Sequence, residues 1–289
     1  MDEDNLTAKE KAVQPGEAAA DLLRETPTLG RKIRLCSGDF KLTYLYYPGK
    51  KALFVNIHGG GFCSKSVLDD DVYCDYLSKT YGLAVLNADF TLSSMAPYPQ
   101  QLVDISSEIL SLLQRFNELA TLPIFLIGHS SGANLAAALA IRYGRELRLG
   151  GCLLNYPFLD LQRDQSDRME LPGTFSSALL EDWIHLYCPY PDLLGRSDVS
   201  PVLLSNEEAA VFPRSVITIA TQDRLQEDGE SFARLLNAAL VENLLLKVDE
   251  RHGFIERHMR SVYQAQDDPA VKNAQNITDQ SIRWLLRLP

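Results

Sequence analysis

One stretch of the sequence decides the fold: Pro123–Ile141 reads PIFLIGHSSGANLAAALAI. Pro123–Ile127 is a short apolar run, which predicts a buried strand, and Gly132–Tyr143 has a composition that favours a helix. Gly128–Gly132 joins the two elements. A connection this short forces its central residue, Ser130, into a strained conformation in which the side chain projects from the end of the sheet. The stretch therefore predicts a strand–turn–helix unit that presents a serine hydroxyl.

Strands and helices alternate on both sides of this unit. The expected strands lie at Arg31–Cys36, Lys41–Tyr47, Ala52–Ile57, Leu83–Ala88, Pro123–Ile127, Gly151–Asn155, Ser215–Ala220 and Leu244–Val248, and the expected helices at Glu17–Arg24, Pro99–Leu119, Gly132–Tyr143, Ser176–Tyr187, Glu227–Leu240 and Asn273–Leu288. The near-continuous apolar runs suit strands that are covered on both faces. The alternation predicts one α/β domain over residues 1–289, with a mostly parallel eight-stranded sheet flanked by helices.

One long segment, Leu161–Pro201, breaks the alternation. A long irregular connection inside a compact domain is usually a binding element or a lid. We therefore expect a helical cap built from residues 1–28 and 161–201. An ordinary crossover helix with an irregular loop is the alternative.

Composition narrows the class of protein. The chain has 289 residues and is 46% hydrophobic, and its formal net charge of −10 disfavours nucleic acid as a partner. The sequence contains no basic-then-apolar leader and no apolar run of about 20 residues, so we expect a cytoplasmic protein with no membrane partner. The histidines are scattered, so no metal is expected, and buried reduced thiols are expected at Cys36, Cys63, Cys74, Cys152 and Cys188.

Ser130 is the candidate nucleophile. Gly128 and Gly132 flank it at the two positions where a side chain would clash in so sharp a turn. The start of the following helix also places positive dipole density beside the hydroxyl, which favours a developing anion. The alternative is a glycine-rich turn at an ordinary strand–helix junction.

His58–Gly61 follows the expected strand Ala52–Ile57 and is the candidate oxyanion hole. Successive glycines allow positive φ angles and let backbone amides approach a ligand closely. Acyl transfer needs such donors fixed in place, and we assign the amides of Gly60, Gly61 and Ser131. A phosphate-binding loop is the competing interpretation, but its usual Lys-Ser/Thr ending is missing. His58 itself is expected to be structural.

A serine nucleophile needs a histidine to take its proton and a carboxylate to orient that histidine. His252 follows the last expected strand after a short loop, and Asp223 follows the strand Ser215–Ala220. Both would lie at the edge where parallel strands end, which is where ligand-facing residues gather. The other histidines and acids near these strands are His129, His185, His258, Asp228, Asp249 and Glu250, and local geometry disfavours each of them.

Two weaker signals complete the residues of interest. Phe62, Trp183, Tyr187 and Phe254 could line a substrate pocket, and packing of the cap onto the sheet is the alternative. Asp69–Asp71 is better explained by helix N-terminal charge than by a cation site.

These motifs together resemble the hormone-sensitive-lipase-like branch of the α/β-hydrolases, the group of bacterial carboxylesterases and acetyl esterases. The resemblance runs from about Lys51 to Phe254 and rests on the motifs at 58–62, 89–92, 128–134, 157–160, 200–201, 223–230 and 252–254. It implies an α/β-hydrolase fold, with Ser130, Asp223 and His252 as catalytic triad and a cap. The chain departs from the family pattern at His129, where an acidic residue is usual, and at Arg224, where proline is common. It also has Thr91 in place of the usual arginine.

The combined interpretation is a carboxylesterase-type serine hydrolase that needs no cofactor and acts on small-molecule esters. A cap of roughly 40 residues suggests a confined pocket and hence short acyl chains such as acetyl or butyryl. Peptide or lactone hydrolysis on the same site is an alternative, and a non-enzymatic small-molecule receptor is a more distant one. The oligomeric state stays open.

Overall fold

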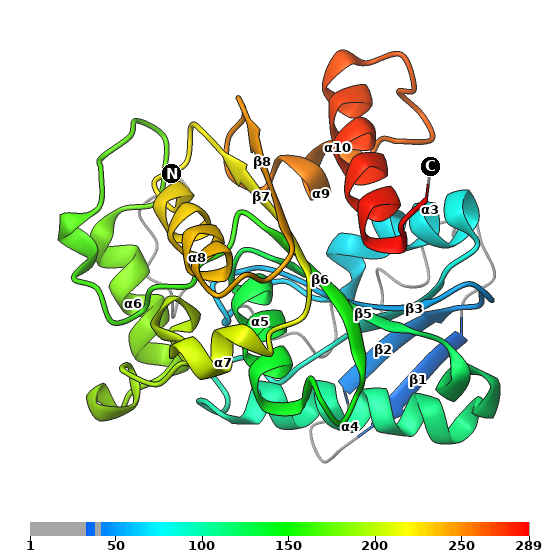
Figure 1. The fold of residues 1–289 in the computed structure, drawn as a ribbon. Helices are drawn as coiled ribbons and strands as arrows, with labels where there is room; N and C mark the ends of the chain where they lie inside the picture. Colours follow the sequence, from blue (N-terminus) through cyan, green and yellow to red (C-terminus); the bar gives the residue numbers. More distant parts are fainter. Residues whose placement is uncertain (1–32, 38–41, 289) are drawn as a thin grey trace.

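A computed structural model describes residues 33–37 and 42–288. The strands of the protein form one mixed sheet (Figure 1). Its eight strands are ordered β1-β2-β4-β3-β5-β6-β7-β8. The strands are β1 (Ile33–Ser37), β2 (Leu42–Tyr47), β3 (Leu53–Ile57), β4 (Ala84–Ala88), β5 (Ile124–His129), β6 (Leu149–Asn155), β7 (Ser215–Ala220) and β8 (Asn243–Val248). β2 pairs antiparallel with β1 and with β4, and all other neighbours are parallel. The predicted eight-stranded, mostly parallel sheet is confirmed.

Helices cover both faces of this sheet (Figure 1). The helices are α3 (Asp71–Tyr81), α4 (Gln100–Arg115), α5 (Ser131–Tyr143), α6 (Ser177–Tyr187), α7 (Asn206–Ala210), α8 (Gln226–Ala238), α9 (Phe254–Met259) and α10 (Pro269–Leu286). Apolar residues of α4, α5, α6 and α8 form one hydrophobic core, and those of α3, α9 and α10 form another. Because side chains alternate along a strand, β3 contributes Val55 to the first core and Phe54 to the second. The sheet is therefore buried from both sides, as its apolar strands require.

The register of the central strands brings several loops to one edge. Ile57 pairs with Gly128 across β3 and β5, and His129 pairs with Asn155 across β5 and β6. β7 and β8 continue the parallel arrangement beyond β6. The residues that follow each of these strands therefore lie side by side at the carboxyl edge, which is where open α/β sheets bind ligands.

Several elements differ from the expected ones. The helix expected over Pro99–Leu119 is two elements, because Phe116 leaves the helical conformation between α4 and a 3₁₀ turn at Asn117–Thr121. α3 was not expected, although Ser66 and Asp69 form a capping box just before it. The helix expected at Glu17–Arg24 and the part of the cap at residues 1–28 lie outside the described residues.

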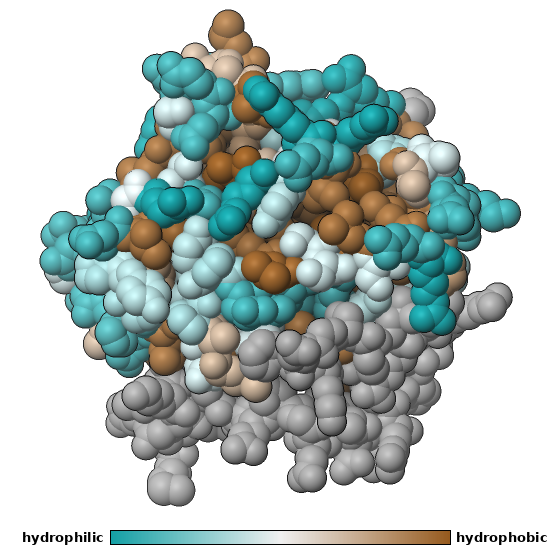
Figure 2. All heavy atoms as spheres, turned by 90° about the horizontal axis from the view of Figure 1, so that it is seen from below, coloured by the Kyte–Doolittle hydropathy of each residue, from teal (hydrophilic) through white to brown (hydrophobic). Residues whose placement is uncertain are grey.

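The surface keeps some large apolar side chains exposed. Figure 2 views the side of the molecule on which α4 lies, where apolar residues reach the surface in patches with hydrophilic side chains between them. Val103 and Leu110 are exposed on α4. Leu240 is 94% exposed and adopts a left-handed conformation just after α8. None of the described helices combines the length and the apolar character that crossing a bilayer requires.

Candidate active site

Ser130 lies in a sharp turn between β5 and α5. Its φ of 56° and ψ of −120° are strained for a residue with a side chain. The Ser130 amide donates to the Asn155 carbonyl at 2.9 Å, which fixes the turn against the end of β6. A Cβ at Gly128 would lie 2.3 Å from the Gly132 carbonyl oxygen, and one at Gly132 would lie 2.3 Å from the Ile57 carbonyl oxygen. Both glycines are therefore required for the turn to pack so closely.

Asp223 and His252 are in direct contact. His252 Nδ1 lies 2.5 Å from Asp223 Oδ2, and the other carboxylate oxygen accepts the Leu225 amide at 3.1 Å. Asp223 is fully buried, whereas His252 keeps part of its surface exposed. Burying a carboxylate is costly unless its oxygens are bound, and both oxygens of Asp223 have partners. The contact assigns the Nδ1 proton to this pair and leaves Nε2 to act on another group.

Two consecutive residues at the end of β6 connect the serine to the histidine. Asn155 binds the Ser130 backbone, and the ring of Tyr156 lies edge-on to the His252 imidazole, with 5.0 Å between ring centroids. Phe175 contacts the same imidazole with a centroid distance of 4.8 Å. Two aromatic rings therefore fix the orientation of the His252 ring.

The glycine loop after β3 lies against the serine turn. Gly60 and Gly61 have φ angles of 108° and 61°, and a Cβ at Gly59 would lie 3.3 Å from the Ser130 Cβ. The Phe62 amide donates to the Ser131 hydroxyl at 3.1 Å and so connects the loop to α5. Among the described residues, the amides of Gly60, Gly61 and Ser131 donate to no protein acceptor. Free backbone donors of this kind are what binding of an oxyanion requires, so these three amides stay the predicted oxyanion hole.

His58 supports this loop and does not face the serine. It is fully buried, its Nδ1 lies 2.8 Å from the Gly59 carbonyl oxygen, and its ring stacks on Phe90 at 4.3 Å. This is the structural role expected from the sequence.

The rival acids and bases are engaged elsewhere. Asp228 binds Arg168 and the amides of Leu159 and Asp160, and Asp249 binds Thr221 and Gln222. His129 is fully buried, His185 is exposed on α6, and His258 lies 3.6 Å from Glu250.

The four residues expected to line a pocket are not equivalent. Phe62 and Tyr187 are fully buried and stack on each other at 3.9 Å, and Phe254 is fully buried against Tyr156. These three pack beneath the surface, which agrees with the packing alternative, and a role for them in a substrate pocket stays a prediction. Trp183 alone keeps exposed surface, and a Cβ on Gly61 would come within 2.3 Å of its ring.

Phe175 was missed from the sequence. It is partly exposed, and its ring lies 4.9 Å from that of Trp183 as well as 4.8 Å from that of His252. The two cap rings therefore span from the glycine loop to the histidine. No periodic pattern marks Phe175, because it lies in an irregular segment before α6.

Two buried arginines hold that segment in place. Arg224, the residue after Asp223, donates to the carbonyls of Phe175 and Gln165 at 2.6 and 3.1 Å and to the Ser177 hydroxyl at 3.0 Å. Arg168 forms a two-pronged ion pair with Asp228 at the start of α8. Segment 161–201, the expected cap, is thus anchored to the loop that carries Asp223. Arg224 was noted from the sequence only as a departure from the family pattern.

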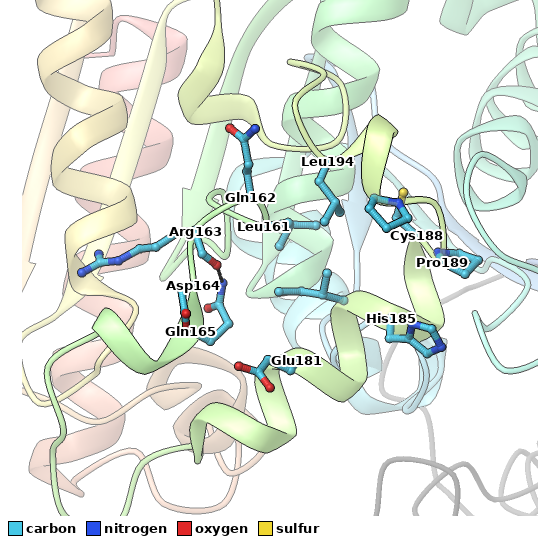
Figure 3. A pocket seen from close by; sticks show the side chains of 12 residues that line it. Leu161, Gln162, Arg163, Asp164, Gln165, Glu181, His185, Cys188, Pro189 and Leu194 are labelled. Atoms are coloured by element: carbon cyan, nitrogen blue, oxygen red, sulfur yellow. Dashed lines mark hydrogen bonds between the residues drawn. The ribbon is translucent and has the colours of Figure 1, made fainter.

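A separate pocket lies on the outer side of α6 (Figure 3). It has a volume of about 320 Å³, and the side chains around it come from α6 and from the segments on either side of that helix. Figure 3 shows Gln165 bonded to the backbone of Arg163 at its rim. None of Ser130, Asp223 and His252 lines it.

Comparison with known proteins agrees with this geometry. A family described as having the alpha/beta hydrolase fold matches residues 54–256. The chain belongs to the α/β-hydrolase fold family. It is 28% identical over 124 residues to hormone-sensitive lipase of Mus musculus, which covers 41% of this chain but 16% of the lipase. It is 25% identical over 236 residues to an arylesterase of Saccharolobus solfataricus, covering 78% of this chain and 76% of the arylesterase.

The fold of this α/β-hydrolase is also that of solved esterases. A hyperthermophilic esterase from Pyrobaculum calidifontis superposes with a TM-score of 0.75 at 21% identity, covering 98% of this chain and 94% of the other. These relatives confirm the resemblance to the hormone-sensitive-lipase-like branch, and their names agree with the expected carboxylesterase-type hydrolase. The chain spans less than a fifth of the mammalian lipase, so its own activity is argued below from the site.

Proposed function

We propose that this protein is a serine carboxylic-ester hydrolase. The observation that carries the proposal is the 2.5 Å contact between His252 Nδ1 and Asp223 Oδ2 beside the strained Ser130 turn. An aspartate on Nδ1 holds the imidazole in the tautomer whose Nε2 can take the serine proton, and it stabilises the imidazolium that forms.

In the proposed reaction, Ser130 Oγ attacks the ester carbonyl carbon and its proton passes to His252 Nε2. The carbonyl oxygen becomes an oxyanion, which the amides of Gly60, Gly61 and Ser131 would hold. The tetrahedral intermediate then expels the alcohol, which leaves with the proton from His252. Water attacks the acyl-enzyme by the same route, releasing the carboxylic acid and restoring Ser130.

The cap supports a preference for short acyl chains. Phe175 and Trp183 are in ring contact with each other, and they also contact His252 and the Gly61 position, respectively. Arg224 fixes the backbone of Phe175, so this aromatic wall is held in position. An acyl group bound at Ser130 therefore meets a wall on the cap side, which suits acetyl and butyryl esters better than long chains.

Active-site labelling with a fluorophosphonate tests the proposal. The wild type should be labelled and should hydrolyse p-nitrophenyl acetate, and Ser130→Ala should abolish labelling and lower kcat by at least about 10⁴-fold. Ser131→Ala is the matched control, because it removes a neighbouring hydroxyl but keeps the nucleophile, and it should still be labelled. Labelling that persists in Ser130→Ala would refute the assignment of the nucleophile.

A further inference from the structure

A buried charged cluster lies directly behind the serine turn, and nothing in the proposed reaction uses it. We call His129, Tyr156 and Glu256 the His129 cluster. All three are buried, and His129 Nδ1 lies 3.5 Å from Glu256 Oε2. The Tyr156 hydroxyl donates to Glu256 and lies 3.3 Å from His129 Nδ1.

The cluster connects the elements that carry the nucleophile and the base. His129 is the last residue of β5 and precedes Ser130, whereas Glu256 lies on α9, four residues after His252. Tyr156 lies between them and places its ring edge-on to the His252 imidazole at 5.0 Å. A contact within the cluster is therefore also a contact between the serine turn and the histidine loop.

Hydrogen bonding fixes the protons of His129. Asn56 uses its amide nitrogen to donate to Asp70 and Asn87, so its oxygen is an acceptor, and His129 Nε2 donates to it at 3.1 Å. Burial alone would lower the pKa of His129, but the carboxylates of Glu256 and Asp70 outweigh burial and raise it. Burial would likewise raise the pKa of Glu256, but His129 and Lys65 lower it. Both pKa directions, together with the 3.5 Å separation of His129 Nδ1 and Glu256 Oε2, favour an imidazolium beside a carboxylate.

We propose that the His129 cluster positions His252 and sets the charge behind it. Glu256 anchors the start of α9 and so the loop that carries His252, and Tyr156 contacts the imidazole ring edge-on. These are positioning residues, because none of them faces the serine hydroxyl. The inference rests on the proposed function, since it assigns to His252 the part of the base.

The other charges around the cluster do not replace this pair. Lys65 lies 3.6 Å from Glu256, and Asp70 reaches His129 only through Asn56. Asp69 and Arg260, which are ion-paired with each other, also act on Lys65, and the ring of Tyr73 meets that of His129 edge-on at 5.2 Å. The cations His129 and Lys65 thus lie close to the anions Glu256 and Asp70. Removing the charge of one of them changes the electrostatic potential at His252.

Several groups contact His252 directly. Asp223 binds its Nδ1, Arg257 donates to its backbone carbonyl at 2.5 Å, and Arg224 is adjacent to Asp223 in the chain. Phe175 and Tyr156 cover its ring and carry no charge at neutral pH. Of these groups only Tyr156 belongs to the His129 cluster, so substitution at 129 or 256 removes no other direct contact of His252.

The sign of a pH shift distinguishes this role from a merely structural one. The Tyr156 ring lies 6.2 Å from the ring of His129 and 5.0 Å from that of His252, so the two imidazoles are no more than about 11 Å apart. Removing the positive charge with His129→Gln favours the protonated base, so the acidic limb of the kcat/KM profile should move to higher pH by roughly half a unit or more. The double variant His129→Gln/Glu256→Gln removes both charges and should return the limb toward the wild-type position.

The experiment measures kcat and KM for p-nitrophenyl acetate from pH 5 to 9, scaled to the fraction of sites that a fluorophosphonate titrates. We expect kcat to fall about tenfold in Glu256→Gln with KM within twofold of wild type. Glu207→Gln is the matched control, because the same change on the exposed part of α7 lies outside the cluster and the His252 loop and should leave both constants unchanged. Tyr156→Phe keeps the ring and loses the hydroxyl, so its kcat should lie between that of Glu256→Gln and that of the control variant.

The inference is overturned if the acidic limb in His129→Gln stays within 0.1 unit of wild type, or if kcat per titrated site is unchanged in Glu256→Gln. A variant that is merely less stable would have fewer sites that the fluorophosphonate titrates and a lower melting temperature, but the acidic limb measured on its remaining sites would not move. This result also counts against the inference. Failure of the proposed function would look different, because the wild type itself would then neither be labelled nor hydrolyse the ester.

Discussion

Adding one methyl group at Gly61 tests the link between the glycine loop, the cap and turnover. Gly61 has a φ of 61°, where a residue with a Cβ is strained by roughly 1–2 kcal/mol. The new Cβ would also lie 2.3–2.7 Å from three atoms of the Trp183 ring. Real Cβ atoms do not approach so closely, so either the ring or the loop must move.

The expected loss follows from the loop's proposed task. If Gly61→Ala displaces one amide of the oxyanion hole, kcat should fall by about 10²–10³-fold, as for the loss of one such donor elsewhere. The backbone strain should also lower the melting temperature by roughly 2–6 °C for a domain of this size.

Gly173→Ala is the matched control for strain. Gly173 has a φ of 74°, but a Cβ there would meet its nearest atom, Arg251 Nη1, at an ordinary 3.6 Å. The melting temperature of both variants should be a few degrees below that of wild type, but only Gly61→Ala should have a lower kcat. A double variant, Gly61→Ala/Trp183→Ala, removes the clash and should recover part of kcat.

The assay is p-nitrophenyl acetate turnover per titrated site, together with thermal unfolding of each variant. The reasoning is refuted if Gly61→Ala keeps kcat within threefold of wild type, or if Gly173→Ala loses as much turnover as Gly61→Ala does.

Three further predictions concern the cap, a helix end and a buried acid. Phe175→Ala should raise kcat/KM for p-nitrophenyl octanoate relative to the acetate by about tenfold, because it removes the ring that contacts His252 and Trp183, and an unchanged ratio would contradict the proposed wall. Leu240→Gly should stabilise the fold by about 0.5–1 kcal/mol in urea unfolding, because Leu240 is exposed with a φ of 59° at the end of α8, and a loss of stability would show that the leucine has a packing role. Burial raises the pKa of Glu108 well above its usual range, so the folded state retains a proton that the unfolded chain releases. The contribution of Glu108 to the free energy of unfolding should therefore fall as the pH rises above about 4.3. In urea unfolding, the free energy of unfolding of Glu108→Gln should increase relative to that of wild type between pH 5 and pH 8. If the two free energies change in parallel over this range, Glu108 has no such shift in pKa.

The strand–turn–helix at Ser130 could be predicted because its constraint is local. Gly128 and Gly132 are needed by the backbone contacts of the turn itself, so their spacing is visible in the sequence. The positions of Asp223 and His252 could be predicted for a similar reason, because each follows an apolar strand and parallel strands end at one edge. Their mutual contact agrees with that expectation, although their roles stay proposals.

Residues set by long-range packing could not be predicted. Phe175 lies beside His252 because Arg224 binds its carbonyl, and nothing near Phe175 in the sequence indicates that distant anchor. The stacking of Phe62 on Tyr187 in the core is another such contact, because it joins residues that are far apart in the sequence. The usual acidic residue before the serine is replaced by His129, and only the fold shows that Glu256 supplies the opposite charge.

The anchoring of the cap segment has a consequence for how substrate is supplied. Arg168 and Arg224 are both almost fully buried, and lifting the segment would break the Arg168–Asp228 ion pair together with the Arg224 hydrogen bonds to residues 165, 175 and 177. Hydrogen bonds that involve a charged group are the stronger ones, so this combined loss opposes the motion. A hinged cover that swings open at an oil–water boundary is incompatible with such anchoring. The enzyme should instead draw on individually dissolved ester molecules, with saturation curves that stay hyperbolic when the substrate passes its solubility limit.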